Sequence, residues 1–99
     1  VNMRGYGHAV RFRADCFMAL NEFERASRDY LAFLRKAPGD GKVWLYLAES
    51  LAMMGDKRSA LEAVDRGLAS GSHWAESLKK MRIKILTDQT IKPHKPLSN

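Results

Sequence analysis

Residues 41–74, GKVWLYLAESLAMMGDKRSALEAVDRGLASGSHW, decide the fold. Each half of this stretch repeats apolar residues at the three- and four-residue spacing of one helix face. The two stripes, over 42–54 and 57–70, consist of Val43, Trp44, Leu47, Ala48, Leu51 and Met54, then Ala60, Leu61, Val64 and Leu68. Between them, Gly55-Asp56 is a helix-stop and turn signal, and Gly71 ends the second stripe. The stretch predicts two antiparallel helices joined by a tight turn.

The sequence on both sides of this stretch continues the helical pattern. Apolar stripes at helical spacing predict helices over 8–20, 22–36 and 74–87. Pro38 ends the second of these, because the residue before a proline avoids the α region. Strand-like alternation is almost absent, and after Thr87 the pattern stops, so 88–99 is expected to be a flexible basic tail or linker. The predicted fold class is all-α.

The sequence also repeats itself when it is shifted by 34 residues. The shift superposes Ala14 on Ala48, Ala26 on Ala60, Leu34 on Leu68, Phe17 on Leu51, Asp15 on Glu49, Tyr30 on Val64, and the turn Asn21-Glu22 on Gly55-Asp56. We expect the four alanines to lie where two helices cross, since a larger side chain there would push the helices apart. Helix–turn–helix content at this period predicts stacked hairpins.

The period and these positions resemble the tetratricopeptide repeat family. The second repeat shows the family pattern as Trp44, Leu47-Ala48, Leu51, Gly55, Ala60 and Val64, and the first as Val10, Ala14, Phe17, Asn21, Ala26, Tyr30 and Pro38. The resemblance implies antiparallel helix–turn–helix repeats stacked as a short α-solenoid. It divides the chain into a flank (1–6), repeat 1 (7–40), repeat 2 (41–74), a capping helix (75–87) and the tail (88–99).

Three residues depart from the family pattern. Arg13 occupies a leucine position, and we expect it either to lie at the exposed edge or to pair with Asp29 or Glu22. Arg82 occupies the small-residue position of the last helix, where a charge can solvate the end of the stack. Ser72 stands in the place of the proline.

Composition excludes several classes of protein. No run approaches the roughly 18 apolar residues of a membrane span. The lone Cys16 cannot form an internal disulfide, which argues against a small secreted domain and weakly favours the cytoplasm. The chain begins at Val1, so we expect either processing or a segment of a longer protein. The net charge of +6 is concentrated in 74–99, and a solvated helix face explains that better than a nucleic-acid site.

Residues that could carry chemistry are few. The three histidines, His8, His73 and His94, are far apart and have no metal-ligand partner at helical spacing. Cys16 aligns with Ser50, where small residues pack, so an inert buried thiol is expected. Both tryptophans are expected to be core anchors. We therefore expect no catalytic residue, no bound metal and no cofactor.

The family resemblance implies a concave groove lined by the first helix of each hairpin, which binds a peptide or helix of another protein. The predicted groove residues are Arg11, Asp15, Met18, Lys42, Leu45, Glu49, Met53, Lys79 and Ile83, with His8, Glu76 and Leu86 at its margins. Family members that clamp a C-terminal carboxylate use asparagine where this chain has Asp15 and Glu49. Acidic residues there would repel a carboxylate, so the expected ligand is a partly apolar segment with some positive charge.

Two other functions stay open at this point. The basic cluster Lys79, Lys80, Arg82 and Lys84 could bind nucleic acid, although it contains no aromatic residue on which bases could stack. Alternatively, the chain could be the helical scaffold of a larger enzyme. The open apolar ends of a two-repeat stack would also allow the domain to dimerise or to continue into further repeats.

Overall fold

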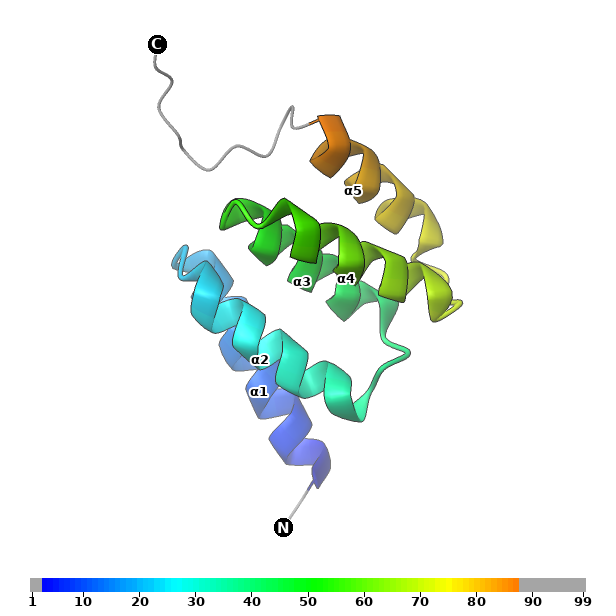
Figure 1. Cartoon of the computed structure of the whole chain (residues 1–99). Helices are drawn as coiled ribbons and strands as arrows, with labels where there is room; N and C mark the ends of the chain where they lie inside the picture. Colours follow the sequence, from blue (N-terminus) through cyan, green and yellow to red (C-terminus); the bar gives the residue numbers. More distant parts are fainter. Residues whose placement is uncertain (1–2, 88–99) are drawn as a thin grey trace.

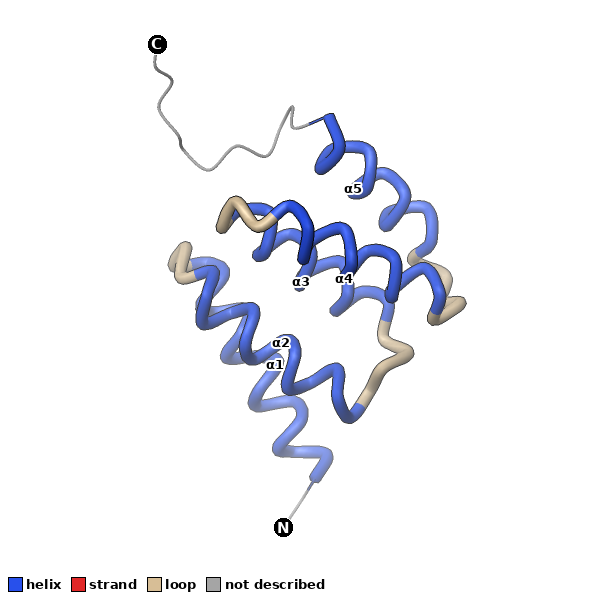
Figure 2. The backbone as a smooth tube through the Cα atoms, in the orientation of Figure 1, coloured by secondary structure: helices blue, strands red, loops and turns tan. Residues whose placement is uncertain are grey.

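The protein is a stack of helices. The computed structural model describes residues 3–87, with side chains from residue 7 onward. The helices are α1 (Met3–Ala19), α2 (Phe23–Lys36), α3 (Gly41–Met53), α4 (Lys57–Ala69) and α5 (Ala75–Thr87). No strand occurs among these residues, as Figure 2 shows. The all-α prediction is confirmed.

The helices pack as two antiparallel hairpins followed by a single helix. α1 packs on α2 and α3 packs on α4, and the hairpins meet where α2 lies against α3. α5 covers the second hairpin by packing on both α4 and α3. In Figure 1, α2 and α4 lie in front, with α1 and α3 behind them. The first helices of the two hairpins therefore lie in one layer and the second helices in another.

The turn inside each hairpin has the same backbone form. Asn21 and Gly55, which the 34-residue offset superposes, both adopt left-handed backbone, with φ of 61° and 84°. This conformation ends an α-helix, and glycine and asparagine are the residues that adopt it most readily. Asp56 then caps the N-terminus of α4, because its carboxylate accepts a hydrogen bond from the Ser59 N–H at 3.1 Å.

The linker between the hairpins is held by the residues that follow Pro38. Asp40 caps α3 by accepting a hydrogen bond from the Val43 N–H at 3.2 Å. The Trp44 indole N–H donates to the Pro38 carbonyl at 2.8 Å, so this core tryptophan also fixes the linker. A Cβ on Gly41 would lie 1.9 Å from the Ser72 hydroxyl. Ser72 therefore packs directly on the start of α3.

The core follows the alanines that the repeat predicted. Ala14, Ala26, Ala48 and Ala60 have no exposed surface. The large side chains buried beside them are Tyr30, Leu34, Val43, Trp44, Leu47, Val64, Leu78 and Ile85. Burial of Leu78 and Ile85 confirms that α5 presents an apolar face to the second hairpin.

The structure corrects two expectations about the first helix. α1 begins at Met3, within the predicted flank 1–6, whereas the apolar stripe predicted a helix only from residue 8. Leu20, the last residue of the helix predicted over 8–20, lies instead in the turn after α1 and is 65% exposed. The tail prediction for 88–99 lies outside the described residues.

Candidate functional site

A hollow of about 220 Å³ opens between the two hairpins, on the layer that holds α1 and α3. Its lining consists of Asp15 and Met18 from α1, Tyr30 from α2, and Tyr46 and Glu49 from α3. Asp15 and Glu49 occupy equivalent positions of the 34-residue repeat, so the stacking of α1 beside α3 brings two carboxylates to one hollow. Three of the predicted groove residues, Asp15, Met18 and Glu49, are therefore grouped.

A hydrogen bond between α1 and α2 organises one wall of the hollow. The Tyr30 hydroxyl donates to Asp15 Oδ1 at 2.5 Å, a length typical of a charge-assisted bond to a carboxylate. Only 1% of Tyr30 is exposed. Burial, followed by the hydrogen bond to Asp15, raises the pKa of Tyr30 well above its ordinary value, whereas the charge of Arg11 acts in the opposite direction. Tyr30 is thus a neutral hydrogen-bond donor that holds Asp15 in place.

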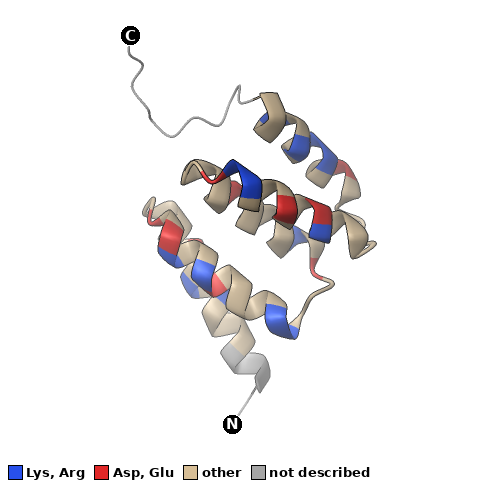
Figure 3. Cartoon of the chain, in the orientation of Figure 1, with Lys and Arg blue, Asp and Glu red and all other residues tan. Residues whose placement is uncertain are grey.

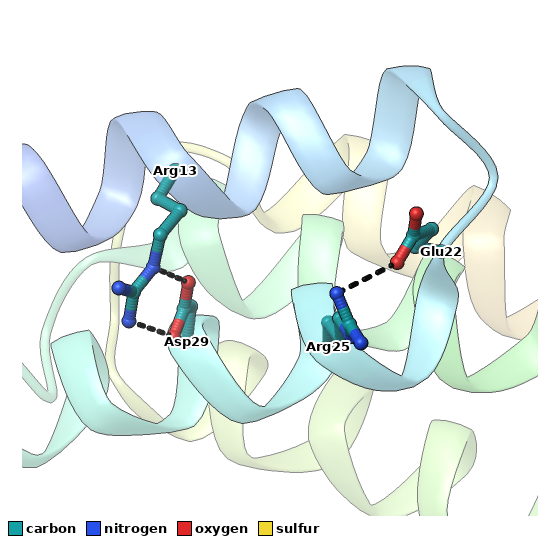
Figure 4. Close-up of polar contacts among 4 residues, drawn as sticks. All are labelled: Arg13, Glu22, Arg25 and Asp29. Atoms are coloured by element: carbon teal, nitrogen blue, oxygen red, sulfur yellow. Dashed lines mark hydrogen bonds and ion pairs between the residues drawn. The ribbon is translucent and has the colours of Figure 1, made fainter.

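A second polar pair joins the same two helices and answers the question that the sequence left about Arg13. The Arg13 guanidinium donates to both carboxylate oxygens of Asp29, at 2.7 and 3.0 Å (Figure 4). The arginine side chain is 63% exposed and the aspartate only 11%. Glu22, the other candidate partner, instead forms an ion pair with Arg25, with 3.3 Å between the guanidinium nitrogen and the carboxylate oxygen (Figure 4). Arg13 therefore compensates a carboxylate that is almost buried between α1 and α2.

Two of the remaining predicted groove residues pack partly into the core. Leu45 and Met53 on α3 are half-buried against it. We expected Leu45 to be a surface residue of the groove floor, so this is a correction: a substitution there also removes packing. The half-buried Lys42 places its ammonium 5.8 Å from the Tyr46 ring centroid and 5.7 Å from that of Trp74, within range of a cation–π attraction.

The last three predicted groove residues lie outside the hollow. Arg11 is half-buried on α1, one helical turn before Asp15. Lys79 and Ile83 are exposed on α5, and Ile83 occupies the position of the repeat that corresponds to Asp15 and Glu49.

Two residues of the hollow were missed by the sequence analysis. Tyr30 was placed in the apolar repeat pattern, Tyr46 was given no role, and neither phenol group was considered. The signal was present at Tyr30, since the repeat superposes it on Val64. A tyrosine in a valine position brings a hydroxyl into the core, and a buried hydroxyl requires a hydrogen-bond partner. Asp15 on the facing helix is that partner.

A second hollow, of about 250 Å³, lies on the other layer, between α2 and α4. Its lining is largely apolar: Leu31, Trp44, Leu47, Leu51, Ser59, Glu62, Ala63 and Arg66. Glu62 and Arg66 form an ion pair within α4 at 3.4 Å, so the charges at its rim are already matched. Leu51, expected on the packing face, is half-buried here.

The basic residues of α5 form an exposed group. Figure 3 shows Lys and Arg along α5, whereas positive and negative residues alternate over the front of α2 and α4. Lys79, Lys80 and Lys84 are exposed, and Arg82 pairs with Asp65 of α4 at 3.3 Å. Arg82 therefore ties the last helix to its neighbour, in addition to solvating the end of the stack.

The structure corrects the expectation for Cys16, whose thiol is exposed. Its repeat equivalent Ser50 is fully buried, because α3 packs against α2, α4 and α5, whereas α1 packs mainly against α2. His8 and His73 are exposed, and His94 lies outside the described residues. Within 3–87, no group of three or more His, Cys, Asp or Glu could hold a metal ion. None of the described helices combines the length and hydrophobicity that crossing a bilayer requires.

Compared with known proteins, the chain matches no family model, no curated protein and no solved structure. The interpretation of the site therefore depends on its own geometry and charge.

Proposed function

We propose that this protein is a non-catalytic interaction module of the tetratricopeptide type, which binds a peptide or helical segment of another protein across α1, α3 and α5. The observation that carries the proposal is the hollow between α1 and α3, lined by residues from equivalent positions of the repeat. The repeat places three residues at equivalent positions, 34 residues apart: Asp15, Glu49 and Ile83. One bound segment would therefore contact all three in order along the stack. The complete burial of the four repeat alanines supports the hairpin geometry that such a surface needs.

The chemistry of this surface favours a ligand with both apolar and positively charged side chains. Two carboxylates, Asp15 and Glu49, lie at its centre, and both would repel the C-terminal carboxylate that some tetratricopeptide proteins bind. Ile83 adds an apolar side chain that is 60% exposed. Positive side chains of the ligand would complement the two carboxylates, and its apolar side chains would cover Ile83.

The groups that could perform chemistry support a non-catalytic role. The strongly shifted group of the described region, Tyr30, is buried and bonded to Asp15, so its raised pKa is explained by the packing of α1 on α2. Perturbed groups of this kind belong to structural networks as well as to active sites. The exposed His8 lies on α1 and the exposed His73 in the turn between α4 and α5, and neither residue lines the hollow.

Selection from a random peptide display library tests the proposal. Peptides that bind the wild-type protein are measured against Ile83→Asp, which places a charge on the proposed binding surface. The matched control is Leu31→Asp on α2, an equally drastic change at a leucine that is 41% exposed and lines the other hollow. Both side chains are exposed, so the free energy of unfolding of each variant should lie within about 0.5–1 kcal/mol of the wild-type value.

We expect Ile83→Asp to weaken the selected peptides at least about tenfold, an effect of roughly 1.4 kcal/mol. Leu31→Asp should leave their affinity unchanged. The reverse pattern would transfer binding to the layer of α2 and α4, and equal affinity for all three proteins would remove both surfaces from consideration. Leu45→Asp is less suitable, because Leu45 packs against the core and its loss would mix unfolding with binding.

A further inference from the structure

The hollow between α1 and α3 combines three kinds of group at one place. Its carboxylates come from Asp15 and Glu49, its accessible aromatic ring from Tyr46, which packs on the buried Tyr30, and its flexible thioether from Met18. Carboxylates attract a cation, aromatic faces attract it through their quadrupole, and a thioether adapts to an alkyl chain. These groups together are complementary to a side chain that is apolar along its length and positive at its end.

Both carboxylates have oxygen atoms that the protein does not use. Asp15 Oδ1 accepts the hydrogen bond from the Tyr30 hydroxyl, and no described residue donates a hydrogen bond to Asp15 Oδ2. Glu49 takes part in no ion pair or hydrogen bond between residues 7 and 87, although it is half-buried. A half-buried carboxylate without a counter-charge is less favourable than one in water, so a cation that enters the hollow gains more than it would at an open surface.

The nearby cations of the protein leave these oxygens free. Arg11 lies one helical turn from Asp15, and Lys42 lies two turns from Glu49. Neither cation forms an ion pair with these carboxylates within the described chain. Lys42 instead lies 5.8 Å from the Tyr46 ring centroid and 5.7 Å from that of Trp74. Tyr46 thus already attracts a cation in the free protein.

The aromatic wall is held in a fixed position before any ligand binds. The Tyr30 and Tyr46 ring centroids are 5.9 Å apart, with the rings tilted by 44°. Tyr30 is fixed by its burial and by its bond to Asp15. A preorganised pocket binds its ligand without the entropic cost of ordering these side chains.

We propose that this hollow, lined by Asp15, Met18, Tyr30, Tyr46 and Glu49, is a subsite for one arginine side chain of the bound segment. This inference depends on the proposed function, since it names the side chain that the binding surface recognises. A guanidinium matches the lining better than an ammonium, because its planar group stacks on a ring while its N–H donors reach two carboxylates. The hollow of about 220 Å³ has room for the guanidinium and its methylene stem.

The direct test uses a single amino-acid derivative, so that it does not require a known partner. N-acetylargininamide is titrated into the protein while the NMR signals of the Met18 methyl group and the Tyr46 ring are followed. N-acetylcitrullinamide, in which a neutral urea group replaces the guanidinium, is the matched control ligand. We expect saturable shifts at both residues with the arginine derivative, at millimolar concentration for so small a ligand, and weaker binding of the citrulline derivative by at least about fivefold.

Variants then assign the binding to the carboxylates. Glu49→Gln and Asp15→Asn should each weaken N-acetylargininamide about fivefold. Asp15→Asn retains an oxygen that can accept the Tyr30 hydroxyl, and Glu49 has no bond to lose, so both variants should fold. Glu24→Gln, which removes an exposed carboxylate from α2, is the control and should bind like wild type. Absence of saturable shifts, equal binding of the two ligands, or insensitivity to Glu49→Gln would each overturn the subsite.

The subsite and the wider binding surface can fail separately. Peptides that lose affinity in Ile83→Asp but not in Glu49→Gln would retain the binding surface and overturn the arginine subsite. Saturable binding of N-acetylargininamide, without any selected peptide that responds to Ile83→Asp, would retain the subsite and overturn the wider surface.

Discussion

The helices of the first hairpin are joined through polar side chains, and those of the second through apolar ones. In the first hairpin, Arg13 on α1 binds both carboxylate oxygens of Asp29 on α2. The 34-residue offset carries these two positions onto Leu47 and Ala63, both of which belong to the buried core. Equivalent positions therefore hold an ion pair in one hairpin and aliphatic packing in the other.

The next pair of positions differs in the same way. Tyr30 donates to Asp15 across the first hairpin, and the corresponding residues of the second hairpin are Val64 and Glu49. Val64 is fully buried and offers no donor, which leaves Glu49 unbonded among the described residues. The carboxylate that the first hairpin partly satisfies is thus unsatisfied in the second.

The number of neighbouring helices explains the difference. α3 packs against α2, α4 and α5, and Leu47 is 1% exposed, so an arginine there would lose more of its hydration than Arg13 does. α1 packs mainly on α2, and the Arg13 side chain stays largely in solvent while its guanidinium reaches Asp29. An ion pair costs less desolvation free energy where one member remains hydrated, because only part of the pair is then removed from water. The comparison shows that equivalent positions of a sequence repeat can stabilise the two hairpins through different interactions.

Truncation of Leu47, the apolar equivalent of Arg13 in the second hairpin, should have the largest effect on stability. Leu47→Ala removes a side chain that is 1% exposed and should lower the free energy of unfolding by about 2–5 kcal/mol, through lost burial and a cavity. Urea denaturation measures the change. Leu20→Ala makes the same truncation at a largely exposed position and should cost no more than about 0.5 kcal/mol. Similar losses in the two variants would contradict the contrast in burial.

Breaking the polar pair should have an intermediate effect. Arg13→Leu leaves the nearly buried Asp29 without its guanidinium and should cost about 1–3 kcal/mol. The double variant Arg13→Leu/Asp29→Ala copies the second hairpin, and its stability should return to that of wild type or exceed it. A double variant as unstable as the sum of the two single variants would show that Asp29 contributes through other interactions.

The smallest effect should appear at alkaline pH, through Tyr30. Its pKa is higher in the folded protein than the ordinary value of about 10, so the unfolded chain loses this proton first. The associated stability is complete below about pH 10 and is lost as the pH rises above that value, by about 1.4 kcal/mol per pH unit. Urea denaturation at a series of alkaline pH values measures the slope.

Tyr30→Phe provides the control for this pH dependence, because it keeps the ring and removes the titrating group. The variant should be less stable at neutral pH, where it lacks the bond to Asp15, and its alkaline slope should be shallower than that of wild type. Identical slopes would indicate that Tyr30 ionises in the folded state as readily as in the unfolded one.

The amino-acid sequence by itself determined the helices, their turns and the alanine interfaces. These features depend on the local spacing of apolar and small residues, and the same spacing occurs in both 34-residue repeats. The helix-stop signals at Asn21 and Gly55 and the small residues at Ala14 and Ala48 act within a single hairpin, so no knowledge of the rest of the fold was needed. The predicted group of Asp15, Met18 and Glu49 followed from the resemblance to tetratricopeptide repeats, and the structure brings these three residues to one hollow.

Only the tertiary structure decided which of the equivalent residues are buried. Cys16 and Ser50 have the same place in the repeat, yet one is exposed and the other is not. The choice of Asp29 over Glu22 as the partner of Arg13, and of Asp15 as the partner of Tyr30, also depended on how α1 lies on α2. Burial and pairing are properties of neighbours that are distant in the sequence, and periodicity describes only a residue's place on its own helix.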